Sequence, residues 1–111
     1  MRVKKQSYTK RKWRQGDVLF VRVRSLPKAE ATKRDNGHIV EGEVTGHVHR
    51  VGTLDAAEVL EIGDGLFLNV TDKGGVSIVH EDHNPLSLPS GVYEVHRQRE
   101  YTPQGIRDVS D

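Results

Sequence analysis

Residues 57–80 have the sequence AEVLEIGDGLFLNVTDKGGVSIVH, and this stretch decides the fold class. Three short runs rich in Val, Leu and Ile, at 57–62, 66–71 and 76–80, are separated by segments that contain glycine and aspartate. Runs of this length and composition between turn residues are typical of β-strands. The segment 72–75 predicts a hairpin turn, because its glycines supply the positive φ that tight hairpins require.

The same pattern continues on both sides of this stretch. Residues 18–24, VLFVRVR, predict a strand, and further strand-like runs occupy 38–43, 47–51 and 92–97. The charged, turn-rich segment 28–37 predicts a surface loop. No stretch shows the sustained periodicity of an amphipathic helix. The sequence therefore predicts an all-β fold, a small antiparallel β-barrel or sandwich formed by residues 16–101 as one domain.

Composition limits the classes of protein that the chain can belong to. Its 111 residues suit one domain, and the 34% hydrophobic content suits one modest core. Because cysteine is absent, a metal would be bound by nitrogen and oxygen ligands alone. No apolar run approaches the length of a membrane span, and the basic start lacks the apolar region of a secretory signal, so we expect a cytoplasmic protein.

Charge is distributed unevenly along the chain. Residues 1–51 carry 13 Lys/Arg and 5 Asp/Glu, and residues 52–111 carry 4 and 11. Residues 1–15 predict a flexible basic N-terminal arm, and residues 102–111 a frayed polar tail. Basic side chains bind phosphates and aromatic rings stack on bases, so the candidate nucleic-acid-binding residues are Lys4, Lys5, Lys10, Arg11, Lys12, Trp13 and Arg14. The alternative is that the arm only aids solubility and that Trp13 closes one end of the barrel.

Four of the six histidines fall in two tight groups, His47-Val48-His49 and His80-Glu81-Asp82-His83. Residues two apart in a strand face the same way, so His47 and His49 can present two nitrogens to one point. His80 shares its face with Val76 and Ile78, the expected core face. Imidazole is the commonest metal ligand among side chains. We therefore expect His47, His49, His80 and His83 to converge on a divalent metal ion, with nearby carboxylates as further ligands or as hydrogen-bond partners of the ligands.

Part of the chain resembles the cupin superfamily of small metal-binding β-barrels. Gly42 and His47-Val48-His49 are similar to the opening of the first cupin motif, with Glu58 later than the usual position of its glutamate, and Pro89-Ser90-Gly91 is similar to the second motif. Glu94 stands where the family has its last histidine, and the second histidine pair lies upstream of Pro-x-Gly. The resemblance implies a barrel with an internal divalent metal.

Three functions follow as expectations. The first is a cupin-like domain that binds a divalent metal. An extension of this role is a metal-dependent enzyme that acts on a small or phosphate-bearing substrate. The second is a non-catalytic nucleic-acid-binding module that uses the basic arm. The third is a metal-independent ribonuclease with histidines as acid and base. The sequence has no motif for a serine or cysteine nucleophile, a phosphate loop or a dinucleotide site, so several large enzyme classes have no support, and whether the protein is an enzyme stays open. A homodimer is a further expectation, because the two halves of the chain carry opposite charge.

Overall fold

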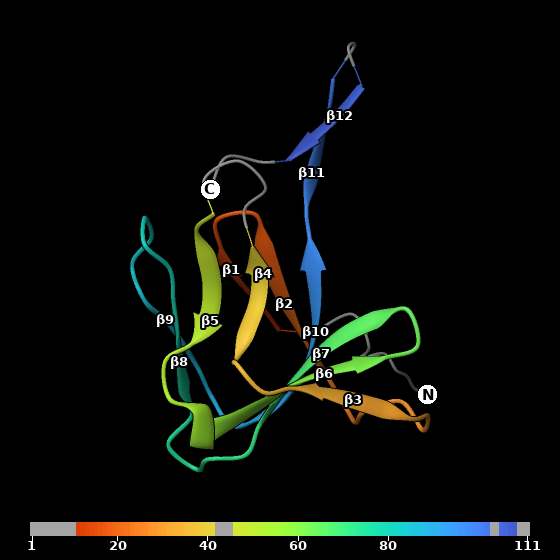
Figure 1. Ribbon diagram of the computed structural model, residues 1–111, viewed down its shortest axis with the longest axis vertical. Helices are drawn as coiled ribbons and strands as arrows, with labels where there is room; N and C mark the ends of the chain where they lie inside the picture. Colours follow the sequence, from red (N-terminus) through yellow and green to blue (C-terminus); the bar gives the residue numbers. More distant parts are fainter. Residues whose placement is uncertain (1–10, 42–45, 103–104, 109–111) are drawn as a thin grey trace, which may run out of the picture.

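The computed structural model describes residues 11–41, 46–102 and 105–108, and its regular structure consists of antiparallel strands (Figure 1). The strands are β1 (Lys12–Gln15), β2 (Val18–Val23), β3 (Ala31–Arg34), β4 (His38–Glu41), β5 (Val48–Val51), β6 (Ala57–Ile62), β7 (Gly65–Val70), β8 (Val76–Val79), β9 (Leu86–Leu88), β10 (Gly91–Arg97), β11 (Arg99–Thr102) and β12 (Gly105–Asp108). One 3₁₀ turn, η2 (Leu54–Ala56), precedes β6. The predicted all-β class is confirmed.

Two open sheets form the body of the molecule. The larger has the strand order β1-β2-β10-β7-β6-β3 and the smaller the order β4-β5-β8-β9. Strands β11 and β12 pair as a separate hairpin that projects away from both sheets in Figure 1. Among the described strands, hydrogen bonding closes neither sheet, so the architecture shown is two antiparallel sheets, and a closed barrel is not observed.

The apolar core lies between the sheets, because alternate residues of each strand face inward. Phe20, Leu68 and Tyr93 of the larger sheet are fully buried, and Ile39 and Ile78 of the smaller sheet belong to the same cluster of buried side chains. Buried apolar side chains of both sheets thus form one main cluster, and Leu60, Ile62 and Phe67 of the larger sheet form a second, smaller one.

The turn at 72–75 exists, but the predicted hairpin is wrong. The backbone N–H of Gly75 donates to the carbonyl of Asp72 at 2.9 Å, which closes the turn. Strand β7 already pairs with β6 on one edge and β10 on the other. The chain leaving β7 therefore crosses to the smaller sheet, where β8 pairs with β5 and β9.

Three segments predicted as irregular contain strands. The predicted loop 28–37 contains β3, which pairs with β6 at one edge of the larger sheet. Residues Lys12–Gln15 of the predicted arm form β1 on the edge of the larger sheet, and the tail contributes Thr102 to β11 and Gly105–Asp108 to β12. An edge strand needs only one partner and no fully apolar face, so a polar sequence can form one. Residues 1–10, the rest of the predicted arm, lie outside the described residues.

Within the described ranges, no helix has the length and apolar character needed to cross a lipid bilayer.

Candidate metal centre

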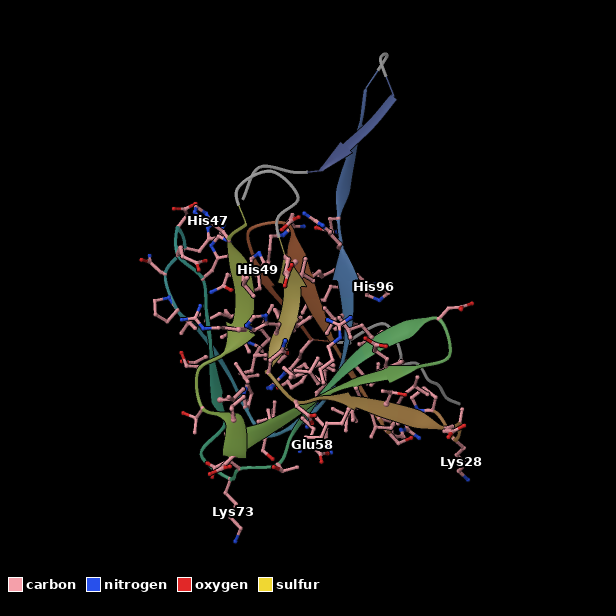
Figure 2. All side chains as sticks on the ribbon, in the orientation of Figure 1. Lys28, His47, His49, Glu58, Lys73 and His96 are labelled. Carbon is pink, nitrogen blue, oxygen red and sulfur yellow. The ribbon has the colours of Figure 1, made fainter. Side chains whose placement is uncertain are left out.

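The pairing of β5 with β8 explains why the two histidine groups meet. These strands are antiparallel with Arg50 opposite Val79. Continuing that register by one residue places His49 opposite His80, and their ring centroids are 4.2 Å apart. His47 precedes β5 and His83 follows β8, so both lie at the same end of the smaller sheet, where Figure 2 labels His47 and His49.

The four imidazole rings form one cluster. The ring centroids of His47 and His80 are 5.7 Å apart, those of His80 and His83 are 4.7 Å apart, and those of His49 and His83 are 5.9 Å apart. His49 and His80 are buried, whereas His47 and His83 are half-buried. The structure thus brings together all four histidines that were selected as metal ligands. The inner part of the cluster is His49 with Gln15 and Asp17, and the outer part is His47 and His80 with Glu81 and Asp82.

In the inner part, Gln15 determines which nitrogen of His49 carries a proton. The amide nitrogen of Gln15 donates to the carbonyls of Ile78 and Asn84, each at 2.9 Å. This fixes the amide orientation, so the Gln15 Oε1 atom, 2.9 Å from His49 Nδ1, can only accept. His49 Nδ1 therefore carries the proton, and Nε2 of the neutral ring has a free lone pair.

Asp17 lies beside this lone pair. Its carboxylate is fully buried, with Oδ1 3.4 Å from His49 Nε2 and Oδ2 2.6 Å from Arg97 Nε. Gln15 and Asp17 flank Gly16, whose φ of +60° allows the tight turn between β1 and β2. The turn places both polar side chains between the two sheets.

Two carboxylates lie in the outer part: Asp82 is beside His47, and Glu81 is a candidate metal ligand. His47 Nδ1 is 2.6 Å from Asp82 Oδ2, and a carboxylate beside one ring nitrogen is common at histidines that bind a metal through the other. Glu81 Oε1 accepts a hydrogen bond from the backbone N–H of Val48 at 3.0 Å. Candidate ligand atoms of His47, His80 and Glu81 all lie within 4.8 Å of one another, which suits one metal ion.

His80 is held differently from the other rings. Its Nδ1 accepts a hydrogen bond from the backbone N–H of Asp82 at 3.0 Å. A neutral His80 therefore carries its proton on Nε2, which has no hydrogen-bond partner among the described residues. For His80 to bind a metal through Nδ1, this hydrogen bond must be exchanged for a metal–nitrogen bond.

Two groups of the cluster have pKa values shifted from their ordinary values, each for a different reason. Burial, and next the adjacent His80, lower the pKa of His49 from 6.5 to about 4, although Asp17 opposes this shift. His49 is therefore neutral near pH 7. The hydrogen bond from the Val48 backbone is the main cause of a lowered pKa for Glu81, which keeps this exposed group ionised as a ligand must be.

Sequence analysis did not select three polar residues that border the cluster, namely Gln15, Asp17 and Arg97. Gln15 fell within the predicted arm, and Asp17 was interpreted only as a turn residue. The available signal was the dipeptide Gly16-Asp17 before a strand, which is typical of a two-residue hairpin turn. A hairpin turn at Gly16-Asp17 predicts that a strand ends at Gln15.

Other residues considered from the sequence lie elsewhere. Glu58 accepts a hydrogen bond from Asn69 at 3.2 Å and lies at the opposite end of the molecule from His47 and His49 in Figure 2. Glu94 is 3.4 Å from His96, which is exposed as expected. The glutamate of the first cupin motif therefore has no counterpart here at the position of Glu58.

The described part of the predicted nucleic-acid surface is Arg11 to Arg14. Arg11, Lys12 and Arg14 are exposed. Trp13 packs edge-on against Tyr93, with ring centroids 5.4 Å apart, and contacts the core. This packing restricts the ring as a platform for a base, whereas the alternative that Trp13 closes one end of a barrel stays a prediction.

Fold and site define a class: a two-sheet antiparallel β-domain with a histidine and carboxylate cluster at one end of its core. The chain belongs to the DUF8820 family, described as a domain of unknown function, which matches residues 14–98. No curated protein and no solved structure shows significant similarity to the chain. The family description assigns no function, so the cupin resemblance stays a prediction.

Proposed function

We propose that this protein binds a divalent metal ion through the outer part of the histidine cluster, with His47, His80 and Glu81 as ligands. The observation that carries the proposal is the grouping of their ligand atoms within 4.8 Å of one another. Two imidazole nitrogens and one carboxylate oxygen form a set suited to ions such as Zn²⁺, and other first-row divalent ions accept the same donors.

The surroundings of the three residues support this assignment. A histidine that binds a metal through one nitrogen commonly has a carboxylate at its other nitrogen, and Asp82 Oδ2 lies 2.6 Å from His47 Nδ1. The half-buried position of His47 and the exposure of Glu81 leave the group accessible from solvent. An ion and a small substrate could therefore both reach this end of the sheet.

Three protein ligands are also the number found in catalytic zinc sites, which keep one position for water or substrate. We therefore extend the proposal to metal-assisted chemistry on a small or phosphate-bearing substrate, in which the ion polarises an oxygen or activates water. This is the cupin-like role in its broadest form, with a donor set that differs from the family motif.

The test is metal binding by untagged full-length protein, stripped with chelator and titrated calorimetrically with Zn²⁺. His47→Ala and Glu81→Gln each remove one proposed ligand, and we expect the affinity to fall at least tenfold in each. His96→Ala is the matched control, because His96 is exposed and contacts Glu94 rather than the cluster. Wild-type protein that fails to bind Zn²⁺, Mn²⁺, Fe²⁺ and Ni²⁺ would end the proposal.

Three other expectations stay predictions. Nucleic-acid binding by the basic residues predicts an affinity that decreases steeply with salt. Metal-independent acid and base catalysis predicts activity that resists chelator, and the His47–Asp82 pair is the place to look for it. The homodimer and the cytoplasmic location likewise stay predictions.

A further inference from the structure

We propose that Arg50 binds a phosphate group beside the outer metal centre, and that the substrate is therefore a small phosphate monoester. This inference rests on the proposed function, because it assigns a substrate class and a recognition residue to the same site. Arg50 lies in β5 opposite Val79, the residue that precedes His80. The strand pairing that brings the histidines together thus also places this arginine beside them.

The side chain of Arg50 reaches the carboxylate that we propose as a metal ligand. Its Nη1 atom lies 3.8 Å from Oε2 of Glu81, and both side chains are nearly half exposed. A charge-assisted hydrogen bond between these atoms would be about 2.7–2.9 Å long, so the contact is a loose one. A guanidinium has five N–H donors, and most of those of Arg50 remain available to a ligand that approaches from solvent.

The distance from Arg50 to a bound ion follows from the two oxygens of Glu81. Oε1 accepts a hydrogen bond from the backbone N–H of Val48 at 3.0 Å, which favours Oε2 as the oxygen that binds the ion. An ion bonded to Oε2 at about 2.1 Å would lie within about 6 Å of Arg50 Nη1. A single oxyanion spans such a distance, with one oxygen bonded to the ion and another hydrogen bonded to the guanidinium at about 2.8 Å.

The charge of the metal-loaded site favours an anionic ligand. Imidazoles that bind a metal are neutral, so the carboxylates of Glu81 and Asp82 balance the charge of a divalent ion. Arg50 then adds one positive charge on the exposed side of Glu81. The ion also offsets the negative charge of Glu81, which weakens the attraction between Glu81 and Arg50 and leaves the guanidinium to an incoming anion.

The number of oxygens distinguishes a phosphate from a carboxylate as this ligand. The planar fork of arginine binds two oxygens in parallel, and the ion binds one more. A phosphate monoester has three terminal oxygens, whereas a carboxylate has two. A phosphate can therefore occupy the ion and both arms of the Arg50 fork at once, and a carboxylate cannot.

The experiment is a calorimetric titration of untagged full-length protein, loaded with one equivalent of Zn²⁺, with methyl phosphate as the probe. We expect Arg50→Met to bind methyl phosphate about tenfold more weakly than wild type, because it removes charge-assisted hydrogen bonds. Arg50→Lys should lie between the two, since lysine keeps the charge and lacks the fork. The matched control is Arg34→Met, which removes an arginine paired with Glu61 at 2.7 Å and should bind like wild type.

The Zn²⁺ affinity of the same variants separates recognition of the substrate from support of Glu81. Arg50→Met should bind Zn²⁺ at least as tightly as wild type, because it removes a positive charge near the ion. A lower Zn²⁺ affinity in this variant would mean that Arg50 positions Glu81, and would overturn the inference. Equal affinity of wild type and Arg50→Met for methyl phosphate would overturn it as well.

Further outcomes distinguish failure of this inference from failure of the proposed function. Wild type that binds Zn²⁺ but not methyl phosphate overturns the inference and leaves the metal centre intact. Equal affinity for acetate and methyl phosphate overturns the substrate class, and equal affinity of metal-free and loaded protein for methyl phosphate shows that the ion takes no part. Wild type that binds no divalent ion ends the proposed function itself, and this inference with it.

Discussion

The two ends of the space between the sheets are built from different chemistry. At one end, the side chains around Leu68 and Tyr93 are apolar and fully buried, apart from the tyrosine hydroxyl, which donates to the carbonyl of Pro89 at 2.5 Å. At the other end, the buried side chains are Gln15, Asp17, His49 and His80. The first end gains stability by removing apolar surface from water, and the second must satisfy or neutralise each polar group that it buries.

This difference predicts how each end responds to metal. Burial of apolar groups does not depend on a bound ion. Buried carboxylate and imidazole groups, in contrast, are stabilised by any cation that binds the folded state. A variant at the apolar end should therefore lose the same stability with and without Zn²⁺. A variant at the polar end should lose less stability when Zn²⁺ is bound.

The largest expected effect is at the apolar end. Leu68 is fully buried in β7, opposite Tyr93 and Val59 in the neighbouring strands. Leu68→Ala should lower the free energy of unfolding by about 4 kcal/mol, because it leaves a cavity. Urea unfolding in chelator and in Zn²⁺ should give the same loss. A loss that Zn²⁺ largely reverses would show that the two ends are not independent.

A smaller effect is expected at the polar end. Arg97→Met removes the guanidinium that contacts the buried Asp17 at 2.6 Å, and should cost about 3 kcal/mol in metal-free protein. A divalent ion bound at the proposed outer centre, in the same polar end, would replace part of the lost positive charge, so the cost should be smaller in saturating Zn²⁺.

The matched control for this prediction is Arg34→Met. Arg34 pairs with the half-exposed Glu61 at 2.7 Å, away from the histidine cluster. Its loss of stability should be below about 1 kcal/mol and the same with and without Zn²⁺. If Arg97→Met were equally indifferent to Zn²⁺, the proposed link between a bound ion and the buried charges of the polar end would be wrong.

The contrast between the two ends also explains what could be predicted from the sequence. The apolar strands β2, β6, β7, β8 and β10 were predicted within about two residues, because alternation and glycine turns are local signals. The convergence of His49 and His80 followed from strand parity and from the pairing of two histidine groups. Edge strands β1 and β3 were not predicted, because their polar sequences carry no sign of the single partner that each has.

The polar surroundings of the cluster could not be predicted for a related reason. A glutamine or aspartate is usually exposed, and nothing in its immediate sequence shows that a tight turn inserts it between two sheets. Gln15 and Asp17 become buried only because β1 packs beside β9 and β2 pairs with β10. Burial of polar residues depends on contacts between distant segments, and periodicity does not contain that information.

The smallest effect expected at the polar end is a dependence on pH that the apolar end does not share. The pKa of His49 is about 4 in the folded protein, against 6.5 for an unperturbed histidine, and the charged groups that face it are His80, His83 and Asp17. Below pH 6.5 the unfolded chain binds a proton at this residue that the folded protein does not bind. Stability of the metal-free protein should therefore decrease as the pH falls, by about 2 kcal/mol between pH 7.5 and 5.

Urea unfolding in chelator at both pH values measures this decrease, and His49→Gln is the variant that should lack its share of it. Protonation of carboxylates elsewhere changes stability in both proteins equally, so the difference between wild type and variant isolates residue 49. An equal loss in the two proteins would mean that His49 is charged in the folded state. The 3.4 Å contact between His49 and Asp17 would then be an ion pair between two buried charged groups.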